Sequence, residues 1–382
     1  MMNPEDFLAK AELQGMKRCL KNIEHISPTA CMINGEKYID FSSNNYLALA
    51  NHPYLIEESV RWTKKFGTGS TASRLISGTL PEYIKLEEKI AQWKGTESAL
   101  IIGSGYMANT GVLSALSSTR KGIIFGDKLN HASLNTGASL AEGKLKRYPH
   151  LNFEILEHLL SETDNDEKII VSDTVFSMDG DICNIEELQY LSEKYNAMLY
   201  LDDAHATGIF GNKGEGLAEK STDIIMGTFS KAMGSYGAYV AGSKIMRDYL
   251  INKCGSFIYS TALPPGVYGA ISAAVSLVQT KEYQEKRDDL KKKSLYLKTE
   301  IQKLGFNTGN TTTPIIPVIL EDIDKTMAVS KFLMNNGIFA IPIRPPTVPR
   351  GTARLRLSIN VDHSYNQINK LLELLDKINE KL

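Results

Sequence analysis

Lys231 carries the strongest chemical signal in the sequence, because it lies in a loop of small and hydroxyl residues that follows an apolar segment, 224–226. Upstream, another apolar strand ends in Asp202-Asp203-Ala204-His205. A lysine can hold pyridoxal 5′-phosphate (PLP) as a Schiff base. A carboxylate beside the pyridine nitrogen keeps that nitrogen protonated, so that the ring withdraws electrons from a bound amino acid. Lys231 alone would be taken for a surface residue, but together with Asp202 it predicts a PLP site.

The residues around Lys231 fit the same chemistry. Thr228 and Ser230 offer hydroxyl groups that could hold a phosphate. Gly234 and Gly237 let the backbone approach a flat ring closely. An ordinary surface loop with a Ser-Lys pair would not need these hydroxyl groups and glycines together, so we favour a cofactor-binding loop.

Two other kinds of site compete with this interpretation. Gly103-Ser-Gly105 follows a strand and Asp127 ends the next one, which imitates a dinucleotide fingerprint and makes an NAD(P)-dependent oxidoreductase the main rival. A dinucleotide site would leave Lys231 unexplained, however. Asp202, Asp203 and His205 could instead hold a divalent cation. Because no second cluster of ligand-type residues completes that coordination sphere, we expect no metal.

Three further residues are candidates for the site. His131 heads an expected helix directly after a strand, where it either stacks on the cofactor ring or is a satisfied structural histidine. Arg354 and Arg356 alternate along a strand and therefore point to one face. That face is either solvated or presents an arginine that binds a substrate carboxylate.

The bulk composition predicts a soluble, cytoplasmic protein. The chain has 382 residues, 42% hydrophobic and 23% charged, with a net charge of −1 and no basic face, so nucleic acid and membrane surfaces are poor partners. Its four cysteines are scattered, which indicates free thiols rather than a metal site or disulfides. No apolar stretch is long enough to span a bilayer. At this length, two packed domains and an arm are expected.

The order of elements predicts an α/β protein with a mostly parallel central sheet, because near-continuous apolar strands alternate with helical patterns. We expect an N-terminal arm (1–48) with a helix over 4–22, a large domain (49–270) and a smaller α+β domain (271–382). Thr79-Leu-Pro-Glu82 predicts a capping box. Sites in such sheets lie at the carboxyl ends of the strands. The expected strands are 98–102, 122–126, 168–172, 197–202, 223–227 and 237–241. The expected helices are 104–117, 131–141, 153–162, 185–195 and 243–252.

The whole chain resembles the α-oxoamine synthases, PLP enzymes of the aspartate-aminotransferase-like fold (fold type I). The stretches that carry the resemblance are Phe41–Leu47, Ser104–Asn109, Asp127–Ser133, Val175–Asp181, Asp202–Gly208, Gly227–Lys231, Tyr259–Thr261 and Ile343–Leu357. Two positions depart from the family pattern: relatives often carry glycine at Ala48 and a Gly-Gly pair after Ser70. Both departures could reshape the acyl channel.

The resemblance implies a role for each site residue. Lys231 would form the Schiff base and move the Cα proton, Asp202 would pair with the pyridine nitrogen, His205 would approach the phenolic oxygen, and His131 would stack on the ring. The phosphate would be held by the remaining cofactor residues, Gly105, Tyr106, Thr228 and, from a partner subunit, Thr261, with Ser177 beside the cofactor. The substrate-binding residues would be Arg18, Asn44, Thr347 and Arg356, together with His131.

The resemblance also implies a homodimeric acyltransferase that condenses an amino acid with an acyl thioester and releases CO₂. Residues 343–357 favour the biotin-pathway branch, in which L-alanine and a pimeloyl thioester give 8-amino-7-oxononanoate. Glycine C-acetyltransferase is the alternative within the family, and a catalytically silent subunit is disfavoured because Lys231 is present. The sequence leaves open whether coenzyme A or an acyl carrier protein carries the acyl group.

Overall fold

A seven-stranded sheet forms the centre of the large lobe in the computed structural model, which describes residues 3–13, 16–164, 167–218 and 221–379. Its strand order is β4-β10-β9-β8-β7-β5-β6. The pairs from β9 to β6 are parallel, and β10 runs antiparallel to both of its neighbours. The strands are β4 (Ser98–Ile102), β5 (Ile123–Asp127), β6 (Lys144–Tyr148), β7 (Lys168–Asp173), β8 (Met198–Asp202), β9 (Ile224–Thr228) and β10 (Ala238–Gly242). The expected mostly parallel sheet is confirmed.

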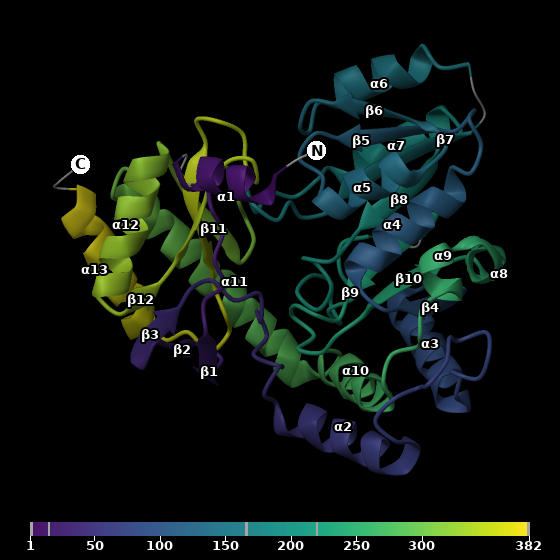
Figure 1. Cartoon of the computed structure of the whole chain (residues 1–382), viewed down its shortest axis with the longest axis horizontal. Coiled ribbons are helices and arrows are strands. Elements are labelled where there is room, and N and C mark those ends of the chain that lie inside the picture. The colour runs from purple at the N-terminus through teal and green to yellow at the C-terminus, as the bar shows by residue number, and fades with distance from the viewer. Residues whose placement is uncertain (1–2, 14–15, 165–166, 219–220, 380–382) are drawn as a thin grey trace.

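Helices pack around this sheet because its strands other than β6 are mainly apolar on both faces and nearly all their residues are buried. Helix α4 packs against α5, β9 and β10, and α3 packs against β4 and β10 (Figure 1). The helices of this lobe are α2 (Pro53–Phe66), α3 (Pro81–Lys94), α4 (Gly105–Leu116), α5 (Ala132–Leu140), α6 (Phe153–Ser161), α7 (Ile185–Lys194), α8 (Lys244–Lys253), α9 (Gly255–Ile258) and α10 (Pro265–Leu277).

The second lobe combines the C-terminal segment with the N-terminal strands (Figure 1). Its sheets have the orders β1-β2-β3-β12 and β11-β14-β13. The long helix α11 leads from α10 into this lobe. The elements are α1 (Pro4–Leu13), β1 (Ile23–Ser27), β2 (Ala30–Ile33), β3 (Glu36–Asp40), α11 (Lys281–Lys303), β11 (Ile315–Glu321), α12 (Ile323–Asn335), β12 (Ile338–Phe339), β13 (Ile341–Ile343), β14 (Ala353–Ser358) and α13 (Tyr365–Asn379). The expected boundary after position 270 falls inside α10. The expected domain boundaries remain predictions.

Two local predictions were wrong. The N-terminal helix ends at Leu13 rather than 22, positions 14–15 lie outside the described residues, and 16–22 are not helical. Thr79 does not cap α3, because Leu80 is the N-cap residue and makes no side-chain capping bond. The Thr79 hydroxyl donates instead to the carbonyl of Arg74. A capping box instead precedes α13, where Ser364 and Gln367 exchange hydrogen bonds.

Ala48 and Thr71, two of the residues that stand where glycine is expected from the family pattern, have left-handed backbones. Ala48 has φ of 57° and Thr71 has φ of 58°. Such angles cost a residue with a Cβ atom about 1–2 kcal/mol, and a β-branched residue is disfavoured most. The fold therefore keeps the backbone that glycine would supply, at the expense of local strain.

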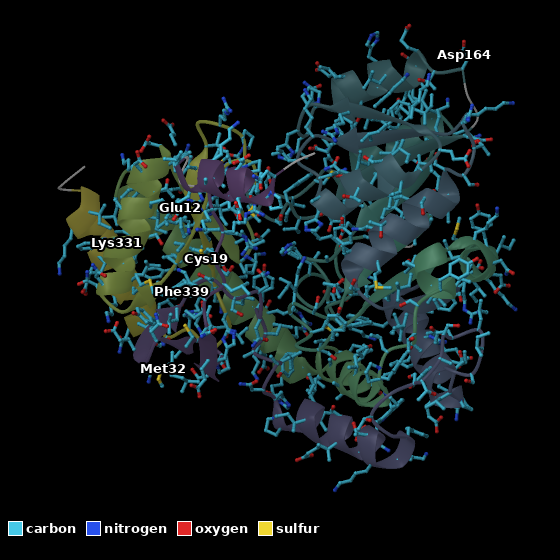
Figure 2. All side chains as sticks on the ribbon, viewed as in Figure 1. Glu12, Cys19, Met32, Asp164, Lys331 and Phe339 are labelled. Carbon is cyan, nitrogen blue, oxygen red and sulfur yellow. The ribbon has the colours of Figure 1, made fainter. Side chains whose placement is uncertain are left out.

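All four cysteines lie within the part of the chain that the structure describes. Cys19, on the exposed segment after α1 (Figure 2), is a free thiol, as are the three buried cysteines. None of the helices in the described part of the chain is long and apolar enough to cross a membrane.

Candidate active site

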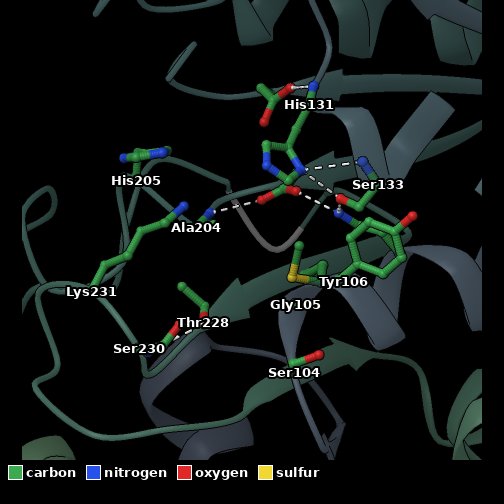
Figure 3. A pocket seen from close by; sticks show the side chains of 14 residues that line it. Ser104, Gly105, Tyr106, His131, Ser133, Ala204, His205, Thr228, Ser230 and Lys231 are labelled. Atoms are coloured by element: carbon green, nitrogen blue, oxygen red, sulfur yellow. Dashed lines mark hydrogen bonds between the residues drawn. The ribbon is translucent and has the colours of Figure 1, made fainter. Parts of the chain in front are cut away.

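A cavity of about 210 Å³ opens where β8 and β9 end and α4 begins (Figure 3). The carboxyl ends of parallel strands meet at one edge of a sheet, so side chains distant in sequence converge there. Lys231, His131 and His205 all point into this space in Figure 3. Seven of the predicted site residues line it: Gly105, Tyr106, His131, Asp202, His205, Thr228 and Lys231.

The side chain of Lys231 lies in this cavity and has a lowered pKa. Burial, which disfavours the ammonium form, lowers the pKa of Lys231 to about 8. The negative charges of Asp202 and Asp173 oppose this effect, and the positive charge of Arg356 adds to it. Near neutral pH a usable fraction of Lys231 is therefore the free amine, which is the form that bonds to an aldehyde or accepts a proton.

Asp202 is fixed by two donors at the end of β8. Its Oδ1 accepts from the backbone N–H of Ala204 at 3.0 Å, and its Oδ2 accepts from Nδ2 of Asn109 at 2.7 Å. The hydroxyl of Tyr200 donates to the Asn109 Oδ1 at 2.7 Å, which sets the orientation of the amide. The carboxylate is 3% exposed and has one defined direction toward the cavity.

His131 is held at the N-cap of α5 by its neighbours. Its backbone N–H donates to Oδ2 of Asp173 at 2.7 Å, and its Nδ1 lies 2.6 Å from the hydroxyl of Ser133. Burial lowers the pKa of His131; the charge of Lys231 acts in the same direction and that of Asp202 opposes it. Burial and the adjacent charge of Asp202 raise the pKa of Asp173 well above its usual range. A neutral imidazole ring, suited to stacking, therefore faces the cavity.

Tyr46 joins three predicted residues that the sequence pattern does not connect. Its hydroxyl lies 2.9 Å from Nδ1 of His205, 3.0 Å from Oδ1 of Asn44 and 3.3 Å from Nη2 of Arg356. Burial lowers the pKa of His205 well below its usual value, helped by the positive charges of Lys231 and Arg356. His205 is thus neutral, and its ring direction is set by the Tyr46 hydroxyl.

The opposite end of the cavity is a helix N-terminus. Ser104 caps α4 by accepting from the N–H of Met107, which leaves the first N–H groups of the helix, at Gly105 and Tyr106, without an acceptor inside the helix. Such groups bind anions such as phosphate. Across from them, the hydroxyls of Thr228 and Ser230 lie 2.7 Å apart.

A second cavity of about 580 Å³ shares His131 with the first. Arg18, Ser177 and Thr347 line it. Nη2 of Arg18 donates to the Thr347 hydroxyl over 3.4 Å, which brings the N-terminal arm to the 343–357 segment. Ser177 lies here rather than in the first cavity, and its carbonyl accepts from Nε of Arg356 at 2.5 Å.

The two arginines of β14 share a face, and that face is buried. Arg354 binds the Asp179 carboxylate at 2.5 Å, and Arg356 binds the Ser177 carbonyl, so both contact one loop. Thr261 lies outside both cavities and this cluster, and Asn44 lines neither cavity but contacts Tyr46. Thr261 lines a small crevice near Arg74 and pairs with Ser73 in a β-bridge.

The donor set of the first cavity fits PLP. A helix N-terminus with hydroxyls suits its phosphate, a fixed carboxylate suits its pyridine nitrogen, and an amine that is partly neutral suits its aldehyde. Sequence reasoning missed Asn109 and Tyr46 as members of this site; Asp173 follows a predicted strand, at the edge where the site was expected, but was given no role. Asn109 and Tyr46 fall within the stretches that resemble the family, but no residue type or spacing marked them.

The family model described as aminotransferase class I and II matches residues 36–375. A curated relative, 8-amino-7-oxononanoate synthase of Trichlorobacter lovleyi, is 43% identical over 381 residues, which covers 98% of this chain and 97% of that protein.

Two solved structures are similar over most of the chain. Serine palmitoyltransferase from S. paucimobilis, with bound PLP, has a TM-score of 0.91 and 28% identity, and the match covers 99% of this chain and 96% of that one. An 8-amino-7-oxononanoate synthase from Francisella tularensis has a TM-score of 0.78 and 27% identity, covering 90% and 98%. These similarities extend over both lobes.

Proposed function

The chain belongs to the class I and II aminotransferase family and, within it, to the α-oxoamine synthases, and we propose that it is a PLP-dependent acyltransferase that makes 8-amino-7-oxononanoate for biotin synthesis. The reaction joins L-alanine to a pimeloyl thioester and releases CO₂ and the free thiol. The observation that carries this proposal is the near full-length similarity to curated synthases of that name, together with Lys231 and Asp202 in one cavity.

The cofactor is expected to occupy the first cavity. Gly105 and Tyr106, through their N–H groups, and Thr228 would hold the phosphate, while Asp202 would keep a proton on the pyridine nitrogen. His131 would lie on the ring face and His205 beside the phenolic oxygen. When bound, PLP supplies a protonated ring that draws electrons from the Cα of the amino acid.

Lys231 has two tasks in this scheme. Its amine would hold the cofactor and, as a free amine, would take the proton from the Cα of the amino acid. A pKa of about 8 suits both directions of transfer, because the amine can accept the proton near neutral pH and later return it.

Arg356 and Tyr46 would orient the amino acid. The guanidinium of Arg356 is 4% exposed and is fixed by the Ser177 carbonyl, the Ser358 hydroxyl and the Tyr46 hydroxyl. A fixed guanidinium can bind the alanine carboxylate and so aim the Cα–H bond at Lys231. Asn44 reaches the same point through Tyr46.

The second cavity would take the acyl chain. Arg18 and Thr347 are already joined by a hydrogen bond and are suited to bind the far carboxylate of a dicarboxylic acyl group. Because the two cavities meet at His131, the thioester carbon would be delivered close to Cα. Ser177, on the wall of this second cavity, would lie between the cofactor and the acyl group.

We further infer a cytoplasmic homodimer in which Thr261 of each copy contacts the phosphate of the other. Two large apolar side chains close in sequence to the Ser73–Thr261 bridge are exposed: Ile76 is 81% and Tyr259 87% exposed. Burial of exposed apolar side chains favours association of two copies. Coenzyme A and an acyl carrier protein both present the acyl group on a phosphopantetheine arm, so either one would be the donor.

The test is direct product analysis. Purified protein incubated with L-alanine and a pimeloyl thioester should give 8-amino-7-oxononanoate by mass spectrometry, with one CO₂ for each thiol released. The Lys231→Ala variant, which keeps the cavity but lacks the amine, should give neither 8-amino-7-oxononanoate nor CO₂. Thiol release without the amino ketone would reject the proposal in favour of simple thioester hydrolysis.

A further inference from the structure

His150 lies between two loops that lead to the proposed active site. Its Nδ1 is 3.0 Å and 3.1 Å from the two carboxylate oxygens of Asp127, which ends β5. Its Nε2 is 2.8 Å from Oδ2 of Asp181. The ring also packs edge-on against Phe176, with ring centroids 4.4 Å apart. One side chain thus contacts both the 127–131 loop and the 176–181 loop.

These contacts require a charged imidazole. A neutral histidine carries one N–H, whereas both nitrogens of His150 face carboxylate oxygens that can only accept. Burial would lower the pKa of His150, but the hydrogen bonds and charges of Asp127 and Asp181 outweigh it and raise the pKa to about 10. His150 is therefore a cation shared by two carboxylates through the neutral pH range.

The two loops are otherwise anchored separately. The Asp127 carboxylate also accepts from the N–H groups of Leu129 and Leu151, which fixes the first loop to its own neighbours. Asp179 of the second loop binds Arg354 on β14. Among the side-chain contacts of the described residues, His150 is the group that bonds to carboxylates from both loops.

The same loops form most of the second cavity. Residues 128–132 supply five of its fifteen lining residues, and 176–179 supply four. Among them are His131, which is also part of the first cavity, and Ser177. The spacing of the two loops therefore sets the width of the passage through which an acyl group reaches the amino acid.

We propose that His150 is a positioning residue that clamps the 127–131 and 176–181 loops at the spacing the acyl donor requires. It touches neither cavity itself and acts through Asp127 and Asp181. This inference rests on the proposed function for its substrate, an acyl thioester, but the clamp itself concerns only residues of this chain.

The first experiment measures the clamp without substrate. Backbone hydrogen–deuterium exchange in His150→Gln should rise in both loops together, since glutamine can bond to one carboxylate but not hold two. Asp181→Asn is a milder variant that keeps the shape of the side chain. His158→Gln changes an exposed histidine on α6 and is the matched control, expected to leave both loops unchanged. Faster exchange in one loop only, or in neither, would overturn the proposal.

The second experiment separates positioning from a general loss of structure. In His150→Gln the KM for the acyl thioester should rise about tenfold, as expected if only about a tenth of the molecules keep the loop spacing that binds it. The KM for alanine and the PLP content of His150→Gln should each differ from the wild-type values by less than about twofold. A lower kcat with an unchanged acyl KM would mean that His150 only supports folding. If the wild type makes no amino ketone, the proposed function fails, while the exchange data still decide the clamp.

The third readout uses the charge of His150, whose facing charged groups are Asp127 and Asp181. Because its folded pKa of about 10 lies above that of an unfolded histidine, its stabilisation is fully present below about pH 6.5 and is lost as pH rises toward 10. The difference in unfolding free energy between wild type and His150→Gln should shrink over this interval. A constant difference would show that His150 is neutral in the folded protein and would refute the clamp.

Discussion

The side-chain amide of Asn109 donates a 2.7 Å hydrogen bond to Oδ2 of Asp202. The same amide nitrogen donates to Ser133 at 2.8 Å, and the amide oxygen accepts from Tyr200. Asn109 is 1% exposed, so the amide has no water to turn toward. Its three bonds fix the carboxylate that is expected to face the cofactor nitrogen, and they connect β8 to α4 and α5.

This relationship predicts the effect of removing the amide. Asn109→Ala should weaken PLP binding and lower turnover about 10- to 100-fold, since a buried hydrogen bond to a charged group contributes about 1.5–3 kcal/mol. Tyr200→Phe removes only the hydroxyl that orients the amide and should have a smaller effect. Asp202→Asn should have the largest effect on turnover of the three variants, because it should raise the activation barrier by about 3–4 kcal/mol. Unchanged kinetics in Asn109→Ala would mean that Asp202 needs no support.

Lys231 is expected to be the residue that bonds covalently to PLP. The protein should be yellow as purified, and borohydride reduction followed by peptide mapping should place the label on the peptide containing Lys231. Lys94 is the natural comparison, because it is also buried but is paired with Asp203 at 3.0 Å. A label on Lys94 or any other lysine contradicts the assignment of the first cavity.

Subunit sharing through Thr261 can be tested by mixing lesions. A heterodimer with Lys231→Ala in one copy and Thr261→Ala in the other should retain about half of wild-type activity at limiting PLP. If Thr261 acts across the interface, both lesions fall in one site and the second site is intact. Activity no higher than that of the Thr261→Ala homodimer would place Thr261 in its own subunit, and a monomer by light scattering would remove the interface altogether.

The left-handed residues offer a prediction about stability. Ala48→Gly should raise the free energy of unfolding by about 1 kcal/mol, because the relief of a strained Cβ exceeds the entropy that glycine costs. Thr71→Gly should gain at least as much, since threonine is β-branched. Ala50→Gly is the control: Ala50 is exposed and has no left-handed backbone, so glycine there should destabilise. Chemical denaturation measures all three, and a destabilised Ala48→Gly would contradict the strain.

The central sheet could be predicted because most of its strands are short runs of apolar residues, which can be recognised in the local sequence. Strands such as 168–173 and 198–202 are apolar, bounded and buried on both faces. The edge strand β6, Lys144–Tyr148, was missed because an edge strand can be as charged as Lys-Leu-Lys-Arg-Tyr. The prediction of a helix reaching position 22 was wrong: α1 ends at Leu13, and none of its side chains is buried, so no core contact favours a longer helix.

The site could be predicted where chemistry is carried by residue type. Lys231, Asp202 and His205 have few alternative roles at strand ends, and the structure brings them to one cavity. Asn109 and Tyr46 could not be found in this way, since they act by orienting other side chains over gaps of 93 and 159 residues. Such partners depend on tertiary packing, which no local pattern encodes.

The central claim is that this chain condenses L-alanine with a pimeloyl thioester. The most direct measurement is kcat/KM for that pair against kcat/KM for glycine with an acetyl thioester, on the same preparation. The account predicts a clear preference for the first pair, carried mainly by the acyl chain, because one methyl group on the amino acid is worth only about 1–3 kcal/mol. A clear preference for glycine and the acetyl thioester would contradict it and place the protein with the glycine C-acetyltransferases.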